Sequence, residues 1–341
     1  MCNKVIITLY STCFLLLSSL AHALDPIPNK DGFTGYINLG LGVINAESNL
    51  ISGNSTVDIG NKTISSLNDD PKSESDSVPV FNGEIAYTFS NARTQIFLGN
   101  QFEDFIEFDL SAQLGVKHEL TDKSLIAVGY LFSTIPTEVW EDPYLTNQAR
   151  SKTDRDSTGI RLEWDRIAGT TATLKYTYRD ISLDDELSGQ LSGLGLTAGD
   201  IKLLDREGKK QHFEGSYRFD FNNGHSLRPK LSFAKHNLDG DAMSNDVWAI
   251  GVTHIYDTTQ YSLITNIDLA STNFDKTNPI FNKTRDDDRW GGTFTAAYKN
   301  AFGIKNWNLL GTAAYFHSDS NIDFYDTTVS MLSITALRRF K

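Results

Sequence analysis

The feature that most constrains this chain is a period of two in its hydropathy, repeated in segments of about ten residues. In 158–165, for example, Ile160 and Trp164 fall on one face, whereas Arg161 and Glu163 fall on the other. The links between these segments alternate between short and long. The pattern predicts an all-β fold, a transmembrane antiparallel up-and-down β-barrel of about 14 strands.

The alternating segments give the expected strands. They lie near 33–46, 80–89, 94–102, 107–117, 125–135, 158–165, 171–183, 213–221, 226–237, 246–256, 261–272, 289–299, 307–317 and 327–340. Single-chain bacterial barrels have an even number of strands, which agrees with this count. Twelve or sixteen strands remain open as alternatives.

The links test the count independently, because a barrel with both termini in the periplasm has a tight turn at every second connection. Short links are expected at 90–93, 120–124, 168–170, 222–225, 257–260 and 300–306, and Asn222-Asn223-Gly224 suits a hairpin. Long polar loops are expected at 47–78, 136–155, 184–208, 238–245, 273–288 and 318–326, whereas the link at 103–106 is unexpectedly short. The 184–208 loop is expected to contain a short helix that begins at Thr197, either outside the barrel or in its mouth.

The N-terminus has the form of an export signal. Lys4 supplies a positive charge, residues 5–20 are mostly apolar, and Ala21-His22-Ala23 is a small-x-small cleavage site. We therefore expect a signal peptide over 1–23 and an outer-membrane β-barrel over 24–341. Both cysteines, Cys2 and Cys13, lie in the leader, so the mature barrel has no disulfide to stabilise it.

Charge and hydropathy exclude two classes of protein. The chain has 31 Lys and Arg against 43 Asp and Glu, a net charge of −12, and no basic stretch that would favour nucleic acid as a partner. Its mean hydropathy of −0.30 excludes a helical membrane protein. A barrel is compatible with this value, because its strands need apolar residues only at every second position.

Aromatic residues on the apolar face collect at opposite strand ends. One group is Phe33, Phe89, Trp164, Phe221, Tyr256, Tyr261, Tyr298, Trp307 and Phe340, and the other is Phe108, Phe132, Phe233, Trp248, Trp290 and Tyr315. Two such belts are expected where a barrel crosses the two membrane interfaces. The last strand ends near Phe340, as outer-membrane barrels commonly do, but Arg338 and Lys341 depart from that signal. We expect Arg338 to extend toward the periplasmic headgroups.

Five strings in the mature chain resemble an uncharacterised outer-membrane, porin-like barrel family of marine gamma-proteobacteria. They are GNQFEDFIEFDLSAQLG (99–115), PTEVWEDPY (136–144), LDGDAMSND (238–246), NPIFNKTRDDDRWG (278–291) and SDSNIDFYDT (318–327). The resemblance implies the fold and an outer-membrane location. It names no activity or substrate, because the family is a domain of unknown function.

The expected size of the barrel makes a pore plausible. Fourteen strands about 4.8 Å apart and tilted by about 40° give a backbone diameter of about 28 Å and leave about 15 Å between side chains. Residues 24–32 are too few to form an N-terminal plug domain, so a water-filled lumen narrowed by an outer loop is expected. The tentative pore-lining residues are Glu84, Asp109, Gln113, Arg161, Glu163, Lys175, Arg179, Glu214, Arg218, Arg228, Lys230 and Asp268.

These observations favour a channel for passive diffusion of small polar solutes. We hypothesise that basic residues such as Lys175 and Arg179 face acidic ones such as Glu84 and Asp109, and that the resulting field selects solutes. Paired wall charges with only a structural role are an equally good interpretation. Expected partners are outer-membrane lipid and lipopolysaccharide, the barrel assembly machinery and small polar solutes, with no nucleic acid and no cofactor.

Two other functions remain open. One is a surface, adhesive or structural barrel that displays its loops without transport. The other is an outer-membrane hydrolase that uses His236 near Asp239 or His317 near Asp319, which we disfavour because no nucleophile motif accompanies them. We therefore expect no enzyme activity and no catalytic residues. The acidic outer loops, such as 286–288, are expected to be solvated, and no metal site is predicted.

Overall fold

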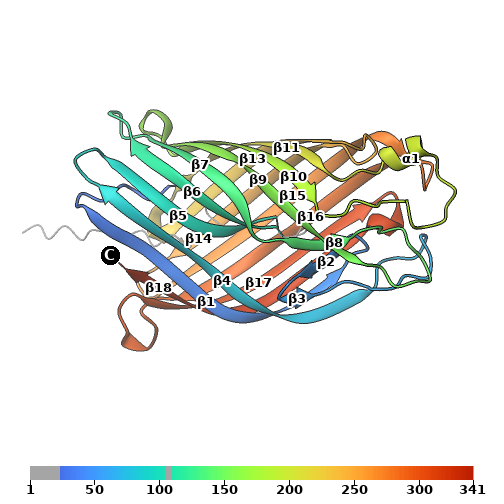
Figure 1. Cartoon of the computed structure of the whole chain (residues 1–341). Helices are drawn as coiled ribbons and strands as arrows, with labels where there is room; N and C mark the ends of the chain where they lie inside the picture. The colour runs from blue at the N-terminus through green and yellow to red at the C-terminus, as the bar shows by residue number, and fades with distance from the viewer. Residues whose placement is uncertain (1–23, 105–108, 341) are drawn as a thin grey trace, which may run out of the picture.

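The computed structural model describes residues 24–104 and 109–340, and they form a closed antiparallel β-barrel (Figure 1). Its fourteen wall strands, counted in these ranges, confirm the predicted fold and number. They are β1 (Gly32–Glu47), β4 (Ser73–Phe89), β5 (Thr94–Asp104), β6 (Asp109–Glu119), β7 (Leu125–Ile135), β9 (Lys152–Asp165), β10 (Ala172–Leu183), β11 (Gly208–Tyr217) continued by β12 (Phe219–Asp220), β13 (His225–Leu238), β14 (Asn245–Asp257), β15 (Tyr261–Asn278), β16 (Lys283–Tyr298), β17 (Trp307–Ser320) and β18 (Thr327–Phe340). The wall closes where β1 pairs with β18, from Gly35 opposite Phe340 to Glu47 opposite Thr328.

Alternation along each strand separates the two faces of the wall. In β1, Leu41 and Val43 are 71% and 59% exposed, whereas Asn38 and Ile44 are buried on the inner side. Successive side chains of a strand point to opposite faces, so the period of two in the sequence becomes an apolar outside and a mainly polar inside.

Aromatic rings border the outer apolar surface at both ends. Near the tight turns, Phe33 contacts Tyr87 with ring centroids 4.9 Å apart. Near the long loops, Trp290 contacts Tyr315 with centroids 5.2 Å apart. Arg338 faces outward beside Trp307, with its guanidinium 5.5 Å from the centre of that ring.

This surface places the protein in the outer membrane. The apolar outer face has aromatic rings at both borders, and ring closure leaves no strand edge unpaired in lipid. No helix in the part of the chain that the structure describes is long and apolar enough to cross a bilayer.

Short and long connections between strands alternate as the sequence predicts. The tight turns lie at the end of the barrel where β1 begins and β18 ends (Figure 1). In the hairpin at Asn222-Asn223-Gly224, Asn223 and Gly224 take φ of 66° and 80°, the positive values for which these residues are suited. The opposite end carries the long loops. By the usual topology of these barrels, the tight turns face the periplasm and the long loops face outward.

The prediction that residues 273–288 form a loop is wrong. β15 and β16 continue to Asn278 and Lys283, and four residues join them. These extensions project beyond the apolar band, where a strand no longer needs an apolar face, so the alternation that marks the other strands is lost. β4 likewise begins at Ser73, earlier than predicted, and the link at 103–106 falls partly outside the described residues.

The predicted short helix is present as α1 (Ala198–Lys202). Thr197 caps it, since its hydroxyl accepts a bond from the Asp200 amide and the Asp200 carboxylate accepts one from the Thr197 amide. This reciprocal pair satisfies amides that the first helical turn leaves without partners. The helix lies at the outer end of the barrel (Figure 1).

Candidate functional site

The inner face of the wall carries the predicted pore-lining residues. Glu84 pairs with Lys117 at 3.3 Å, and Lys175 pairs with Glu214 at 3.2 Å, so several wall charges are compensated locally. The members placed on the inner face are Glu84, Gln113, Arg161, Glu163, Lys175, Arg179, Glu214, Arg218, Arg228, Lys230 and Asp268. The side chain of Asp109 lies outside the described part. A role of these residues in permeation stays a prediction.

A cavity of ≈ 610 Å³ lies inside the barrel, largely against the inner faces of β9 to β18. Its lining is strongly basic among the residues that the structure describes. Ten Lys and Arg residues line it: Arg155, Arg161, Lys175, Arg179, Arg206, Lys210, Arg228, Lys230, Arg285 and Arg289. Three acidic residues line it: Glu214, Asp268 and Asp287. The cavity therefore has the opposite charge balance to the whole chain.

Two buried arginines lie along the wall of this cavity. Arg161 donates to the Thr177 hydroxyl at 3.0 Å and to the Gln113 side chain at 3.4 Å. Arg179, on the neighbouring strand, donates to the hydroxyl of Ser111. Both guanidinium groups thus extend from β9 and β10 toward β6, which fixes their positions on the lumen surface.

A hairpin from the first outer loop folds into the lumen and narrows it. It consists of β2 (Ile51–Asn54) and β3 (Val57–Asp58), which pair with each other, and β2 also pairs with β8 (Thr137–Trp140). Its apolar residues pack on inward-facing residues of β1, β4 and β18. The buried members of this cluster are Ile44, Ala46, Ile51, Val57, Ile59, Val78 and Val329. Residues 51–58 are therefore the constriction hairpin.

Beyond the hairpin, the other outer loops pack together as an outer cap. Its buried apolar members are Ile64, Tyr144, Leu204, Ile322, Phe324 and Tyr325. The Asn278 amide donates to the Tyr325 hydroxyl at 2.7 Å, and this hydroxyl lies 2.7 Å from that of Tyr144. Burial raises the pKa of both tyrosines above its ordinary value, so both remain neutral donors and acceptors. The cap is thus a packed structure across five loops.

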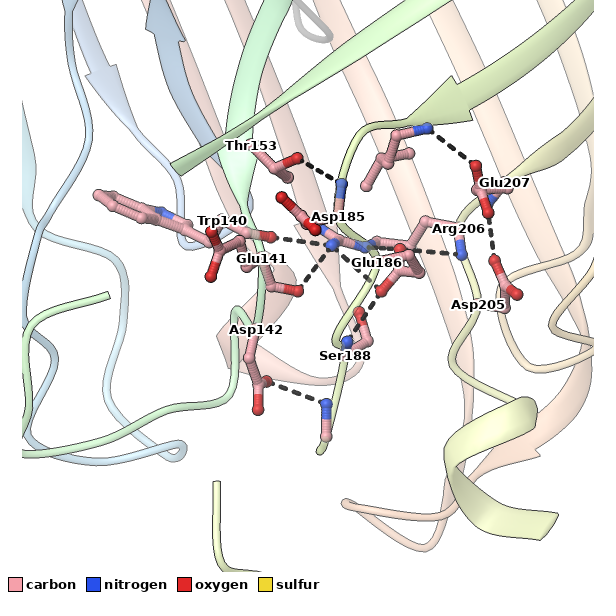
Figure 2. A network of polar contacts seen from close by, with 12 residues as sticks. Trp140, Glu141, Asp142, Thr153, Asp185, Glu186, Ser188, Asp205, Arg206 and Glu207 are labelled. Carbon is pink, nitrogen blue, oxygen red and sulfur yellow. Dashed lines mark hydrogen bonds and ion pairs between the residues drawn. The ribbon is translucent and has the colours of Figure 1, made fainter. Parts of the chain in front are cut away.

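A polar network ties two loops of this end together at the cavity wall (Figure 2). Arg206 pairs with Glu186 at 2.7 Å and donates to the carbonyl oxygens of Trp140 and Glu141 at 2.8 and 3.1 Å. Asp142 accepts from the amides of Gly189 and Leu191 at 3.0 and 2.9 Å. Residues 136–151 and 184–207 are therefore joined by several polar contacts, and Arg206 lines the cavity.

Arg150, in the loop that contains β8, anchors the constriction hairpin. Its side chain is buried, and its guanidinium lies 4.3 Å from the centre of the Trp140 ring. It donates to the carbonyl oxygens of Asn49 at 2.9 Å, Pro143 at 3.0 Å and Asn61. One side chain thus holds both ends of residues 49–61 against the loop that contains β8.

The periplasmic end is narrowed by residues 24–31, the N-terminal segment. Arg93 donates to the carbonyl oxygens of Ile27 at 2.9 Å and Pro28 at 3.1 Å, and Arg166 donates to that of Leu24 at 2.7 Å. Arg93 and Arg166 lie in different turns, so the segment crosses part of the opening between them. These residues are too few for a plug domain, as predicted, but the segment, without a strand of its own, still lies across part of the opening.

Asp25 of this segment is half-buried among charges from several strands. Burial raises the pKa of its carboxyl above the ordinary value, although Lys117, Arg339 and Arg166 act in the opposite direction. The segment is thus held in a charged inner environment.

The two histidines considered for catalysis lie on opposite faces of the wall. His236 lines the cavity. His317 faces outward, where its ring centroid lies 6.1 Å from that of Trp290 and its Nδ1 lies 3.0 Å from the Thr328 hydroxyl. Among the described residues, no three His, Cys, Asp or Glu side chains lie together as metal ligands would.

The sequence predicted a lumen narrowed by an outer loop, but not that the hairpin at 51–58 forms the constriction, and the outer cap and the bound N-terminal segment were not predicted. A signal was available in the first case, because Ile51, Val57, Ile59 and Ile64 stand within an otherwise polar loop. Apolar residues in a loop indicate burial. Nothing in the sequence indicates which surface buries them.

Residues 32–337 match the model of a protein family described as "Protein of unknown function (DUF2860)". This match spans almost the whole barrel. Among curated proteins, none is similar enough in sequence to count as a match. The marine gamma-proteobacterial source suggested by the resemblance stays a prediction.

Several solved outer-membrane proteins share the general barrel fold at low identity. A FadL homologue of Pseudomonas aeruginosa is 14% identical, with 91% of this chain and 90% of that chain covered and a TM-score of 0.47. The Ralstonia pickettii toluene transporter TbuX is 12% identical, covers 91% and 90%, and has a TM-score of 0.44. The channel DcaP of Acinetobacter baumannii is 11% identical, covers 91% and 97%, and has a TM-score of 0.43. At these values the likeness concerns the fold and not the cargo.

Proposed function

We propose that this chain, a member of the DUF2860 family of proteins of unknown function, is an outer-membrane channel for passive diffusion of small polar solutes. The observation that carries the proposal is a cavity of ≈ 610 Å³, with many charged side chains in its lining, inside a closed wall whose outer face is apolar. A barrel that served only as an anchor would need no such interior, because side chains can fill a small barrel.

The passage that we propose is narrow. The constriction hairpin occupies the side of β1, β4 and β18, and the outer cap and the N-terminal segment obstruct the two openings. Solutes would therefore pass along the wall from β9 to β17, past the basic residues. This favours small solutes over large ones and a conductance below that of an open fourteen-strand barrel.

Purified protein in a planar lipid bilayer tests the proposal. We expect discrete conductance steps from the wild-type protein and larger steps when residues 51–58 are replaced by a short Gly-Ser linker. The linker variant is needed because the constriction hairpin could itself silence a functional channel. Silence from both proteins, with correct folding shown by resistance to heat in gel electrophoresis, would overturn the proposal.

The packed outer cap favours a display function as the second candidate. Its loops have their own apolar cluster, which gives the outer surface a defined shape. Electrical silence together with binding of intact cells to a host surface or glycan array would support it. The proposal includes no catalytic step.

The outer wall and its ends suggest the remaining partners. We propose that lipid and lipopolysaccharide surround the aromatic belts, and that the barrel assembly machinery recognises the last strand. Arg338 next to Trp307 suits the periplasmic headgroup region.

A further inference from the structure

Charges of alternating sign cross the inner wall from β9 to β15. Glu163 of β9 stands directly opposite Lys175 of β10, and Lys175 stands directly opposite Glu214 of β11. Lys230 of β13 lies one diagonal step from Glu214, and Asp268 of β15 follows it. These five residues form the alternating row, in which each charge is followed by one of opposite sign. Lys175, Glu214, Lys230 and Asp268 line the cavity.

Contacts within the alternating row join neighbours of opposite sign. The Nζ of Lys175 lies 3.2 Å from Oε1 of Glu214, and the Nζ of Lys230 lies 2.7 Å from Oδ1 of Asp268. These pairs keep bonding capacity for a solute, since an ammonium has three donors and a carboxylate has about four acceptor sites. The side chains of Lys230 and Asp268 are 33% and 28% exposed, against 8% and 10% for Lys175 and Glu214. The pair of Lys230 and Asp268 is therefore the more accessible one.

A glycine allows Lys230 and Asp268 to meet across the strand between them. Gly251 of β14 stands directly opposite both residues. A Cβ atom at this position would lie 2.4 Å from Oδ1 of Asp268 and 2.4 Å from Cε of Lys230, which is closer than such atoms approach. Any other residue at 251 would thus push the two side chains apart. The contact depends on three strands and not on the flexibility of lysine alone.

Neighbouring opposite charges distinguish solutes by their charge pattern. A small anion that approaches Lys230 is repelled by Asp268, and a small cation that approaches Asp268 is repelled by Lys230. An α-amino acid carries an ammonium and a carboxylate on one carbon. Its carboxylate can therefore accept from the Lys230 ammonium while its own ammonium donates to Asp268. Charged side chains on a low-dielectric wall act strongly on a solute that passes close to them.

We infer that the alternating row makes the channel selective for small zwitterions, of which α-amino acids are the simplest class. This inference rests on the proposed channel function and names its substrate class. It depends on the adjacency of opposite charges and not on the net charge of the lumen. Other lining charges, such as Arg161 and Arg228, alter the preference between anions and cations. Only neighbouring opposite charges favour a solute that carries both signs.

Uptake of four solutes of similar size into proteoliposomes tests the inference. They are labelled alanine, a zwitterion; lactate, an anion; 2-amino-1-propanol, a cation; and lactamide, which is neutral. With uptake by protein-free vesicles subtracted, the wild type is expected to admit alanine faster than the other three.

Two substitutions at the accessible pair should reduce this preference in opposite directions. Lys230→Met and Asp268→Asn should each slow alanine uptake about tenfold, the loss typical of one hydrogen bond to a charged group. Lys230→Met leaves a carboxylate, so the cation should then be favoured over lactate relative to the wild type. Asp268→Asn leaves an ammonium, so lactate should be favoured over the cation. Resistance to heat in gel electrophoresis shows that each variant folds.

A second lysine of β13 provides the matched control. Lys235 also pairs with an aspartate, Asp246, at 3.1 Å, but its odd position in β13 places it on the outer face, whereas Lys230 faces inward. Lys235→Met should therefore leave alanine uptake unchanged. Lys230→Arg, which keeps the charge, should recover most of the preference that Lys230→Met loses. Equal effects of Lys235→Met and Lys230→Met would overturn the assignment to the alternating row.

Failure of this inference can be separated from failure of the channel. Equal uptake of all four solutes, or a preference for alanine that either Lys230→Met or Asp268→Asn leaves unchanged, would overturn zwitterion selectivity and leave the channel in place. Uptake of no solute, both by the wild type and by the variant with residues 51–58 replaced by the Gly-Ser linker, would overturn the channel and this inference with it.

Discussion

At the residue scale, arginines hold the segments that narrow both ends of the lumen. Arg150 fixes the constriction hairpin through three carbonyl oxygens, and Arg93 fixes the N-terminal segment through two carbonyls and the side chain of Asn29. Arginine suits this task, since its rigid fork of five donors satisfies several carbonyls that no strand pairs. These segments need such anchors because they have few backbone partners of their own.

Replacing Arg150 should loosen the hairpin. Arg150→Met leaves three carbonyl oxygens without this donor and should destabilise the outer loops by about 2–4 kcal/mol. Limited proteolysis of residues 49–61 in purified barrels measures this as faster cleavage. Lys152→Met is the matched control, since Lys152 is 31% exposed and its ion pairs with Asp58 and Glu138 are worth about 0–1 kcal/mol. Equal cleavage of the two variants would contradict the anchor role.

Asp25 makes the N-terminal segment sensitive to acid. Burial raises the pKa of its carboxyl in the docked state, so the docked state takes up a proton more readily than the free segment does. Docking is thus tightest at acid pH and weakens as the pH rises through that raised value. A fluorophore attached to Lys30→Cys should be less accessible to acrylamide at pH 4 than at pH 7. Asp25→Asn should abolish the difference, and persistence of the difference would count against Asp25.

At the scale of elements, strands were far easier to predict than loops. The predicted ranges 125–135 and 327–340 coincide with β7 and β18, because each strand that crosses lipid must alternate along its whole length. The extension of β15 past residue 272 was missed, since Asp275, Lys276 and Thr277 stand clear of the lipid and face no such requirement. Alternation of apolar and polar residues is therefore required only where a strand crosses the membrane, and it is lost beyond the membrane.

In the candidate site, too, the residues on strands were predictable from the sequence, whereas those in loops were not. Inward positions such as Lys175 and Arg228 follow from strand alternation alone, so they were predictable. The constriction hairpin depends on which distant strands a loop meets. β2 pairs with β8, about 85 residues further along the chain, and no local pattern specifies such a contact.

The N-terminal segment should behave as a removable obstruction. Arg93→Ala combined with Arg166→Ala removes the donors to Leu24, Ile27 and Pro28, so the periplasmic opening should widen and single-channel conductance should rise about twofold. Bilayer recordings measure this directly.

The matched control for this prediction is Lys123→Ala. Lys123 shares the partner Glu119 with Arg93 but makes no bond to the N-terminal segment among the described residues, so its loss should leave conductance unchanged. A rise in this control, or none in the double variant, would show that the segment does not limit the current.

At the scale of the whole molecule, the barrel separates three environments within one wall. The outer face is apolar, the outer loops are acidic and packed, and the cavity lining in the described residues contains more Lys and Arg than Asp and Glu. A charge is therefore tolerated on one face of a strand and costly on the other, although the two positions may be adjacent in sequence. This difference distinguishes a membrane barrel from a soluble one, whose outer face accepts charge freely.

Two lysine substitutions test that distinction directly. Ile334 is 66% exposed in the middle of β18, and Ile334→Lys should cost about 2–4 kcal/mol of unfolding free energy, the usual loss for lysine at the bilayer midplane. Ser232→Lys, on the cavity lining, should cost well under that amount, because the new side chain faces the lumen and not lipid. Urea titration in lipid vesicles, followed by tryptophan fluorescence, gives both values. Equal losses would mean that the two faces of the wall do not meet different solvents, and the channel function and the membrane location both depend on that difference.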